Sequence, residues 1–273
     1  MNYHQRRTML NLLIGCILFL IAYQPANGTS IVAQLEDDRI FLAADVRRNQ
    51  SDAMGNNSSH DDYCKIRVLG NSAVAVTGRT DYKRSGLSDS LSDWNALDDA
   101  EGVYSSALSL TEFASDWARH AIAHYQKFLN VAASRVIELA KPTGVLVGAF
   151  IVGWGEHGPL LVYDKVYLDE NPLPTVRAFQ QVLPPRASPY TTNGITQELI
   201  ESDSGRSRAS AAQWDVARAG FSDQDVDWRK VEFLIKSTAD YDTSVGKTVN
   251  VLQIPKGGQA IWLQNATCPE GRK

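Results

Sequence analysis

The sequence predicts an α+β fold in which helices pack outside antiparallel sheets. Short apolar, β-branched runs alternate with helical patterns in the order strands, helices, two strands, helices, two strands. Neighbouring strands joined by tight turns form antiparallel pairs, and each helix must bury its apolar face against a sheet. The composition agrees, because 44% apolar and 21% charged residues are typical of a packed globular protein.

Residues 1–28 have the three-part pattern of a secretory signal. A basic start with two arginines precedes an almost uninterrupted apolar run at 9–23, and small residues follow before position 29. The apolar run is shorter than the roughly 20 residues that a membrane-spanning helix needs. We therefore expect cleavage after Gly28, export to the periplasm or the exterior, and one mature domain at 29–273 with no stable membrane span.

Other interpretations of this segment stay open. Arg6-Arg7 matches a twin-arginine export signal, and residues 13–16 have the residue types of a bacterial lipid-attachment site ending at Cys16. The lipid interpretation is weaker, because mostly apolar residues follow Cys16 where a mature lipoprotein usually turns polar. An uncleaved helix or a lipidated Cys16 would leave the protein anchored to the membrane.

The mature region is acidic and keeps two cysteines. Residues 1–28 contain two of the 27 basic residues and none of the 31 acidic ones, so 25 basic against 31 acidic residues give a net charge of −6. This balance provides no basic surface for nucleic acid, and we expect no nucleic-acid partner. An oxidising compartment permits a disulfide between Cys64 and Cys268. Two separate thiols are equally consistent with the sequence.

The mature chain begins with a predicted β-hairpin. Residues 29–36 and 39–45 are β-branched and apolar runs around an acidic turn. If the turn is Asp37-Asp38, paired positions sum to 75, and if it has three residues they sum to 74. In either register Asp45 lies within one residue of the position opposite Thr29.

The remaining elements follow from the periodicity of apolar residues and from turn residues. Ser109 and Glu112 form a capping box that opens a long helix, and Pro142 ends it. In chain order we expect a polar loop at 47–62, strands at 64–69 and 73–77, an irregular insertion or poorly regular helix at about 80–108, strands at 144–154 and 158–163, a proline-rich loop at 168–195, helices at 195–201 and 226–238, and strands at 248–254 and 259–263.

Cleavage after Gly28 would make Thr29 the first residue of the mature protein, with a free α-amine beside its hydroxyl. A hydroxyl is a poor nucleophile until a base removes its proton, and an α-amine with a pKa of about 7.7–8.0 does this near neutral pH. The alternative is a threonine that merely starts a strand.

Four short segments near the start of the mature region form a series. They are 28–32, 42–47, 64–66 and 73–78, which read GTSIV, LAADVR, CKI and AVAVTG. In this order they resemble the N-terminal signatures of proteasome β-type subunits and their bacterial relatives, the N-terminal-nucleophile hydrolases. Residues 239–252 resemble the segment where that family has an Asp, a Ser and glycines before a strand. The resemblance implies a four-layer αββα sandwich of two antiparallel sheets.

The resemblance also implies roles for the matching residues. Thr29 Oγ would attack a carbonyl carbon while the α-amine moves the proton. Lys65 would lie beside the nucleophile as a cation, and Asp45 would orient that ammonium. The backbone amide of Gly78, which has no Cβ to block approach, would donate to the developing oxyanion.

Three further residues have supporting roles in the same resemblance. Arg47 would support the acidic end of the strand, and Asp242 and Ser244 would bracket the α-amine. The chain departs from the family pattern here, because Ser244 requires a one-residue slip and Asn193 stands where the family often has another serine. Taken singly, such residues are usually surface pairs or turn residues.

We expect no cofactor and no metal. His120 and His124 are four residues apart on the predicted helix, but the glutamate of the zinc-protease pattern is absent between them, which favours packing or surface roles. Gly246-Lys247-Thr248 resembles the end of a phosphate-binding loop, yet Tyr241 occupies the position of the required earlier glycine.

The main hypothesis is an exported, proteasome-like N-terminal threonine hydrolase that cleaves peptide or other amide bonds through an acyl-enzyme on Thr29. The alternative is a non-catalytic binding or assembly module that keeps the fold. The fold does not choose between peptide and other amide substrates. A homo-oligomer is also open, since members of the family often form rings.

Overall fold

A computed structural model describes most of residues 29–273. The described residues are 29–51, 57–82, 92–141, 144–185, 189–192, 199–200, 228–265 and 267–268. The expected signal at 1–28, with Cys16, and the departure at Asn193 lie outside them. No helix among the described residues is long and apolar enough to cross a membrane.

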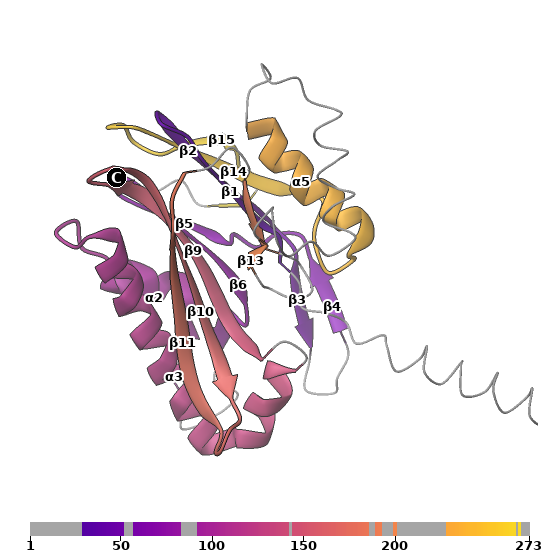
Figure 1. Cartoon of the computed structure of the whole chain (residues 1–273). Helices are drawn as coiled ribbons and strands as arrows, with labels where there is room; N and C mark the ends of the chain where they lie inside the picture. The colour runs from indigo at the N-terminus through magenta and orange to yellow at the C-terminus, as the bar shows by residue number, and fades with distance from the viewer. Residues whose placement is uncertain are drawn as a thin grey trace, which may run out of the picture.

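Two antiparallel sheets form the centre of the molecule (Figure 1). The six-stranded sheet has the order β13-β12-β1-β2-β14-β15, and the five-stranded sheet has the order β11-β10-β9-β6-β5. The strands of the first are β1 (Ile31–Leu35), β2 (Arg39–Asp45), β12 (Tyr190–Thr192), β13 (Leu199–Ile200), β14 (Val249–Pro255) and β15 (Ile261–Gln264). Those of the second are β5 (Ile66–Leu69), β6 (Ser72–Gly78), β9 (Val145–Gly155), β10 (Gly158–Asp169) and β11 (Thr175–Leu183).

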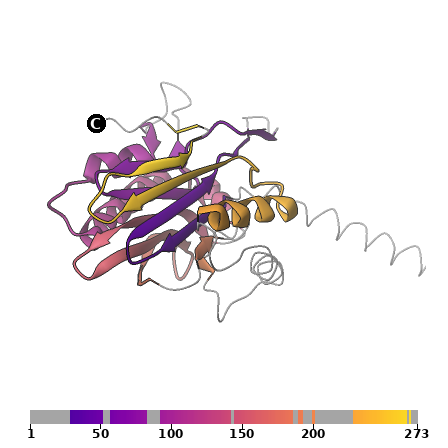
Figure 2. The ribbon, with the colours of Figure 1, turned by 90° about the horizontal axis from the view of Figure 1, so that it is seen from above.

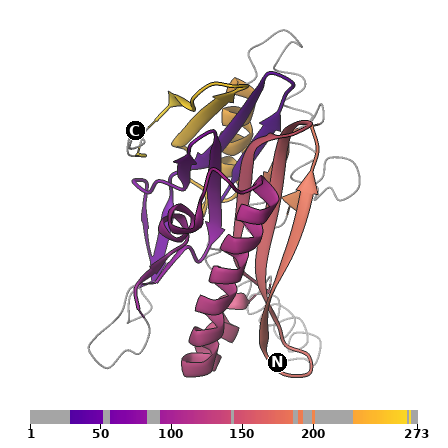
Figure 3. The same cartoon turned by 90° about the vertical axis from the view of Figure 1, so that its left-hand side faces the viewer.

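Helices cover the outer faces of both sheets, as Figures 2 and 3 show. α2 (Ala96–Val103) and α3 (Leu110–Ala140) pack on the five-stranded sheet, and α5 (Trp228–Tyr241) packs on the six-stranded sheet. Apolar side chains from both sheets, Leu42 and Phe150 among them, fill the space between the sheets. The α+β class is therefore confirmed, and this order of layers is compatible with the expected sandwich.

The first hairpin and the capping box agree with the sequence. Ile31 pairs with Ala44, so paired positions sum to 75 and the turn is the two-residue one. At the start of α3, the Ser109 backbone N–H donates to Glu112 Oε2 over 2.9 Å, and the Glu112 N–H donates to Ser109 Oγ over 3.3 Å. The hairpin register places Asp45 opposite Ser30, one residue from Thr29.

Three regions expected to be irregular contain regular structure. The expected loop at 47–62 contains a small hairpin, β3 (Arg48–Ser51) and β4 (Asn57–His60). Residues 80–108, expected to be an irregular insertion or a poorly regular helix, contain the regular helix α2. Asn95 Oδ1 caps its first turn by accepting from the N–H of Leu97 over 2.9 Å. A short bridge of β7 (Asp81–Tyr82) with β8 (Trp94–Asn95) precedes this helix.

The proline-rich region at 168–195 was expected to be a loop and contains β11 and β12 instead. Prolines flank β11 without interrupting it, and this strand pairs with β10 over its whole length. Its other edge has no partner strand among the described residues, which is where flanking prolines are tolerated. The expected helix at 195–201 is also wrong where it is described, because residues 199–200 form β13.

Cys64 and Cys268 form a disulfide between the two sheets. Cys64 lies two residues before β5, and Cys268 lies four residues after β15. The sequence left open a disulfide or two separate thiols, and the structure has the disulfide.

A buried carboxyl lies in the core between α3 and the five-stranded sheet. Asp164 is on the same face of β10 as the apolar Val162 and Val166, and none of its surface is exposed. Burial raises the pKa of Asp164 to about 7, and the side-chain amide of Gln180 on β11 offsets this effect only in part. The folded protein therefore ionises this group only at a free-energy cost.

We predict that Asp164→Asn stabilises the protein at pH 8 and has little effect at pH 4. An unfolded carboxyl ionises near pH 4, so between about pH 4 and 7 the folded state binds more protons than the unfolded state. The stability of the wild type must then fall as pH rises through this range. Urea unfolding at several pH values measures the difference, with Asp37→Asn in the exposed turn as the control. A gain in stability of Asp164→Asn that is the same at every pH would contradict ionisation of Asp164 as its cause.

Candidate functional site

The end of the first hairpin places a buried carboxylate beside the start of β1. The N–H of Ser30 donates to Asp45 Oδ1 over 2.9 Å, and the N–H of Asp45 donates to the Ser30 carbonyl oxygen over 3.2 Å. Asp45 has no exposed surface. Because Thr29 directly precedes Ser30, the register that orders the hairpin also places Thr29 next to the residue that pairs with Asp45.

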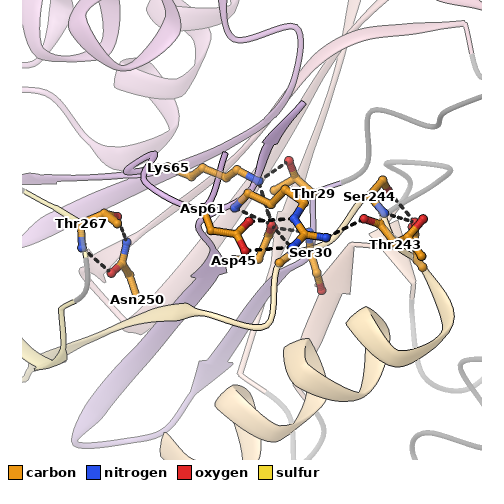
Figure 4. Close-up of polar contacts among 12 residues, drawn as sticks. Thr29, Ser30, Asp45, Asp61, Lys65, Thr243, Ser244, Asn250 and Thr267 are labelled. Carbon is orange, nitrogen blue, oxygen red and sulfur yellow. Dashed lines mark hydrogen bonds and ion pairs between the residues drawn. The ribbon is translucent and has the colours of Figure 1, made fainter. Parts of the chain in front are cut away.

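Lys65 joins Thr29 and Asp45 in one buried cluster (Figure 4). Its Nζ lies 3.0 Å from each carboxylate oxygen of Asp45 and donates to Thr29 Oγ over 2.9 Å. Only 4% of the Lys65 surface is exposed. Asp45 ends β2 of the six-stranded sheet, whereas Lys65 directly precedes β5 of the five-stranded sheet. The ion pair therefore connects the two sheets where β2 ends and β5 begins.

Backbone amides complete the shell around Asp45. In addition to Lys65 and the Ser30 N–H, the N–H of Arg47 donates to Oδ2 over 3.0 Å and the N–H of Gly246 donates to Oδ2 over 2.9 Å. A buried carboxylate costs several kcal/mol unless its oxygens are hydrogen-bonded. The first hairpin, the start of β5 and the loop before β14 thus supply the donors that stabilise this buried charge.

The electrostatics of the cluster favour loss of the Thr29 hydroxyl proton. Burial lowers the pKa of Lys65 from its ordinary value, and the Asp45 carboxylate opposes this effect. Asp61 also raises the pKa of Lys65, whereas Arg47 lowers it. An ammonium 2.9 Å from a hydroxyl oxygen stabilises the alkoxide that forms when the proton leaves.

Arg47 fastens a distant segment to this cluster. Its Nε and Nη2 donate to the two oxygens of Asp61 over 2.7 and 2.9 Å, and its Nη1 donates to the Thr243 carbonyl oxygen over 2.8 Å. The hydrogen bond to Asp61 raises the pKa of Arg47, and the same bond lowers the pKa of Asp61. Arg47 therefore remains a cation that holds residues 243–246 against Asp45.

Asp242 and Ser244 form a buried pair in that segment. The N–H and the Oγ of Ser244 donate to Asp242 Oδ1 over 2.9 and 2.5 Å. The segment reaches Asp45 through Gly246 and Arg47 through Thr243. Asp242 and Ser244 thus lie in the loop that borders the cluster, and their expected role around the α-amine stays a prediction.

Gly78 ends β6 with its amide on the Lys65 side. The N–H of Val76 donates to the Lys65 carbonyl oxygen over 3.0 Å. Amides two residues apart along a strand point to the same edge, so the Gly78 N–H points to the edge that carries Lys65. Gly78 has a φ of +87°, a conformation that glycine adopts without strain.

Two residues beside this cluster were not predicted from the sequence: Asp61 binds Arg47, and Gly246 donates to Asp45. Asp61 was part of an expected polar loop, and Gly246 was considered only in a phosphate-loop pattern. A Cβ on Gly246 would lie 2.9 Å from Arg47 Cβ and 3.1 Å from Arg47 N. Only glycine lets the backbone come this close, and the position of Gly246 as the single glycine of the resembling segment 239–252 was the signal that could have identified this contact.

The two helical histidines have packing and surface roles. The ring of His124 stacks on Trp94 with 4.4 Å between centroids, and burial lowers its pKa to about 4. His120 is exposed, with Nδ1 3.2 Å from Asp99 Oδ1. The two side chains therefore have separate partners.

The predicted site residues fall into two groups by their contacts. Thr29, Asp45 and Lys65 contact one another directly or through Lys65, and Arg47, Gly78, Asp242 and Ser244 lie in adjoining segments. Comparison with known proteins adds no assignment, because no protein-family model and no curated protein matches this chain. Function must therefore be inferred from the geometry of the site.

We predict that Asp45→Asn destabilises the protein by about 3–5 kcal/mol, because it leaves the Lys65 ammonium buried without its counter-charge. Adding Lys65→Met to this variant should recover part of the loss, since the uncompensated charge is then gone. Urea unfolding of the single and double variants measures both changes. An Asp45→Asn protein as stable as the wild type would contradict the buried ion pair.

We predict that Gly246→Ala destabilises the protein by about 1–3 kcal/mol, because its Cβ must push the loop away from Arg47 and Asp45. The matched control is Gly102→Ala in α2, where a Cβ meets nothing within 4 Å. The free energy of unfolding of this control should rise by about 0.5–1 kcal/mol, because alanine has a higher helix propensity than glycine. Equal effects at the two positions in thermal unfolding would argue against the close approach at Gly246.

Proposed function

We propose that the mature chain is an exported, proteasome-like N-terminal threonine hydrolase with the αββα fold of that class. One observation carries this proposal: a buried lysine donates to Thr29 Oγ over 2.9 Å while both oxygens of Asp45 hold it at 3.0 Å. A threonine that merely starts a strand has no need of a buried ion pair at its hydroxyl, because such a pair adds little net stability.

Acylation begins with attack by Thr29 Oγ on the carbonyl carbon of an amide substrate. The α-amine of Thr29 takes the Oγ proton as the new C–O bond forms. Lys65 stabilises the negative charge that develops on Oγ, and the Gly78 N–H donates to the carbonyl oxygen as it becomes an oxyanion. When the C–N bond breaks, the leaving amine takes the proton from the α-amine, and the acyl group stays on Oγ as an ester.

Deacylation uses the same groups with water as the nucleophile. Water attacks the ester carbon and gives a proton to the α-amine, and this proton returns to Oγ as the carboxylic acid leaves. Asp242 and Ser244 are assigned to hold the α-amine in place. Asp45 orients Lys65, and Arg47 keeps the neighbouring loop closed on Asp45, so these residues support the reacting atoms without bonding to substrate.

Activation depends on cleavage between Gly28 and Thr29. Before cleavage the Thr29 nitrogen belongs to a peptide bond and has no lone pair that can accept a proton. Removal of residues 1–28 creates the amine at the position where Lys65 already contacts the hydroxyl. Export and activation are therefore one event in this proposal.

We predict that a β-lactone acylates the exported protein once, at Thr29. Attack opens the lactone ring, so the whole probe mass stays on Oγ, and intact-mass and peptide analysis locate it. Thr29→Ala should show no addition, and Thr29→Ser should keep part of the rate because it retains both a hydroxyl and an α-amine.

The alternative function, a non-catalytic binding or assembly module, predicts a different outcome. A folded mature protein that starts at Thr29 and gains no probe mass would favour that alternative. Equal probe addition to the wild type and to Thr29→Ala would place the reactive group elsewhere and contradict the proposal.

A further inference from the structure

The ion pair of Lys65 with Asp45 joins the two sheets. Asp45 is fixed on its own sheet by β1 on one side and β14 on the other. Lys65 precedes β5, a four-residue strand at the edge of the other sheet that pairs only with β6 among the described strands. The lysine is therefore the less firmly held partner.

A disulfide lies next to that lysine. Cys64 is bonded through its peptide carbonyl to Lys65, and its sulfur is bonded to Cys268, 204 residues later in the sequence. Cys268 follows β15, the edge strand of the sheet that carries Asp45. The covalent bridge therefore spans the same two sheets as the ion pair, one residue away from it.

The Cys268 end of the bridge is held in place by two asparagines. Asn265 accepts from the Cys268 N–H and donates to the Cys268 carbonyl oxygen, both over 2.8 Å. Asn250 Nδ2 lies 2.9 Å from Thr267 Oγ and 3.1 Å from Cys268 Sγ. Asn250 is 1% exposed. The bridge is thus anchored to β14.

Asn250 connects the disulfide to the strand that carries Asp45. On β14 it pairs with Ala44 of β2, the residue before Asp45. The path therefore runs from Asp45 through Asn250, Cys268 and Cys64 to Lys65, and the ion pair of Lys65 with Asp45 completes it. Every link is a covalent bond, a strand pairing or a hydrogen bond between described residues.

We propose that the Cys64–Cys268 disulfide positions Lys65 against Thr29 and Asp45, and so sets the reactivity of the nucleophile in addition to stabilising the fold. This inference rests on the proposed function of Thr29. A displacement of a catalytic group by about 1 Å can cost roughly 100-fold in rate. A lysine that directly precedes a short edge strand needs such a constraint more than an aspartate whose strand is paired on both sides.

The direct test removes the bridge in the exported protein with Cys64→Ala/Cys268→Ala and follows acylation by the β-lactone. We expect the maximal acylation rate to fall roughly 10- to 100-fold while the half-saturating probe concentration stays unchanged. The control is Val136→Ala in the helix-side core, which is buried in α3 away from the path between Asp45 and Lys65. It should lower the unfolding midpoint and leave the acylation rate unchanged.

The pH profile of acylation separates positioning from stability. With Lys65 in place, its ammonium lowers the pKa of the nearby α-amine. Loss of the bridge should move the apparent pKa of acylation up toward the free-amine value of about 7.7–8.0. The other charged groups that act on Lys65, which are Asp45, Asp61 and Arg47, are retained in the variant. A disulfide that only stabilises the fold would leave this apparent pKa where it is.

A second variant keeps the test decisive if the cysteine-free protein does not fold. Asn250→Ala keeps the disulfide and releases Cys268 from β14, so it should give a smaller change of the same kind in rate and apparent pKa. A wild type that reacts at Thr29, with neither variant altering these two values, would overturn the positioning role alone. A wild type that gains no probe mass at Thr29 would overturn the proposed function itself.

Discussion

The buried ion pair of Lys65 and Asp45 is the constraint on which the site depends. Removing two charges from water costs several kcal/mol per ion, and only close pairing with full hydrogen bonding compensates for it. The chain meets this demand with amides from Ser30, Arg47 and Gly246 and with both contacts from Lys65. The hairpin register and the close approach at Gly246 both bring donors to this carboxylate.

The same pair explains why segments distant in sequence meet at this end of the molecule. The first hairpin, the start of β5 and the loop at 242–246 each supply one part, and Arg47 holds two of them together. Apolar residues of similar volume would often be as stable as a buried ion pair. Its position against a hydroxyl therefore points to chemistry, because stability alone does not require it.

Local sequence patterns predicted much of the fold, whereas features that depend on contacts between distant residues were not predicted from these patterns. The capping box and the two-residue turn depend on neighbours in sequence, so the start of α3 and the position of Asp45 near Thr29 followed from the residues. Strand β11 was missed because flanking prolines suggested a loop, although prolines are tolerated at an edge. Local patterns could not establish the contact of Gly246 with Asp45 or decide whether Cys64 pairs with Cys268, since each contact joins residues about 200 positions apart. The resemblance to a family predicted the cluster of Thr29, Asp45 and Lys65, but not the backbone amides that hold it.

In the proposed function, Thr29 becomes the N-terminal residue and acts through its own amine. The most direct measurement is the N-terminal sequence and intact mass of the exported protein. A chain that begins at Thr29 has the amine beside the hydroxyl that Lys65 contacts, and this is the predicted result. A mature chain that begins at any other residue would lack this base and would contradict the proposed role of Thr29.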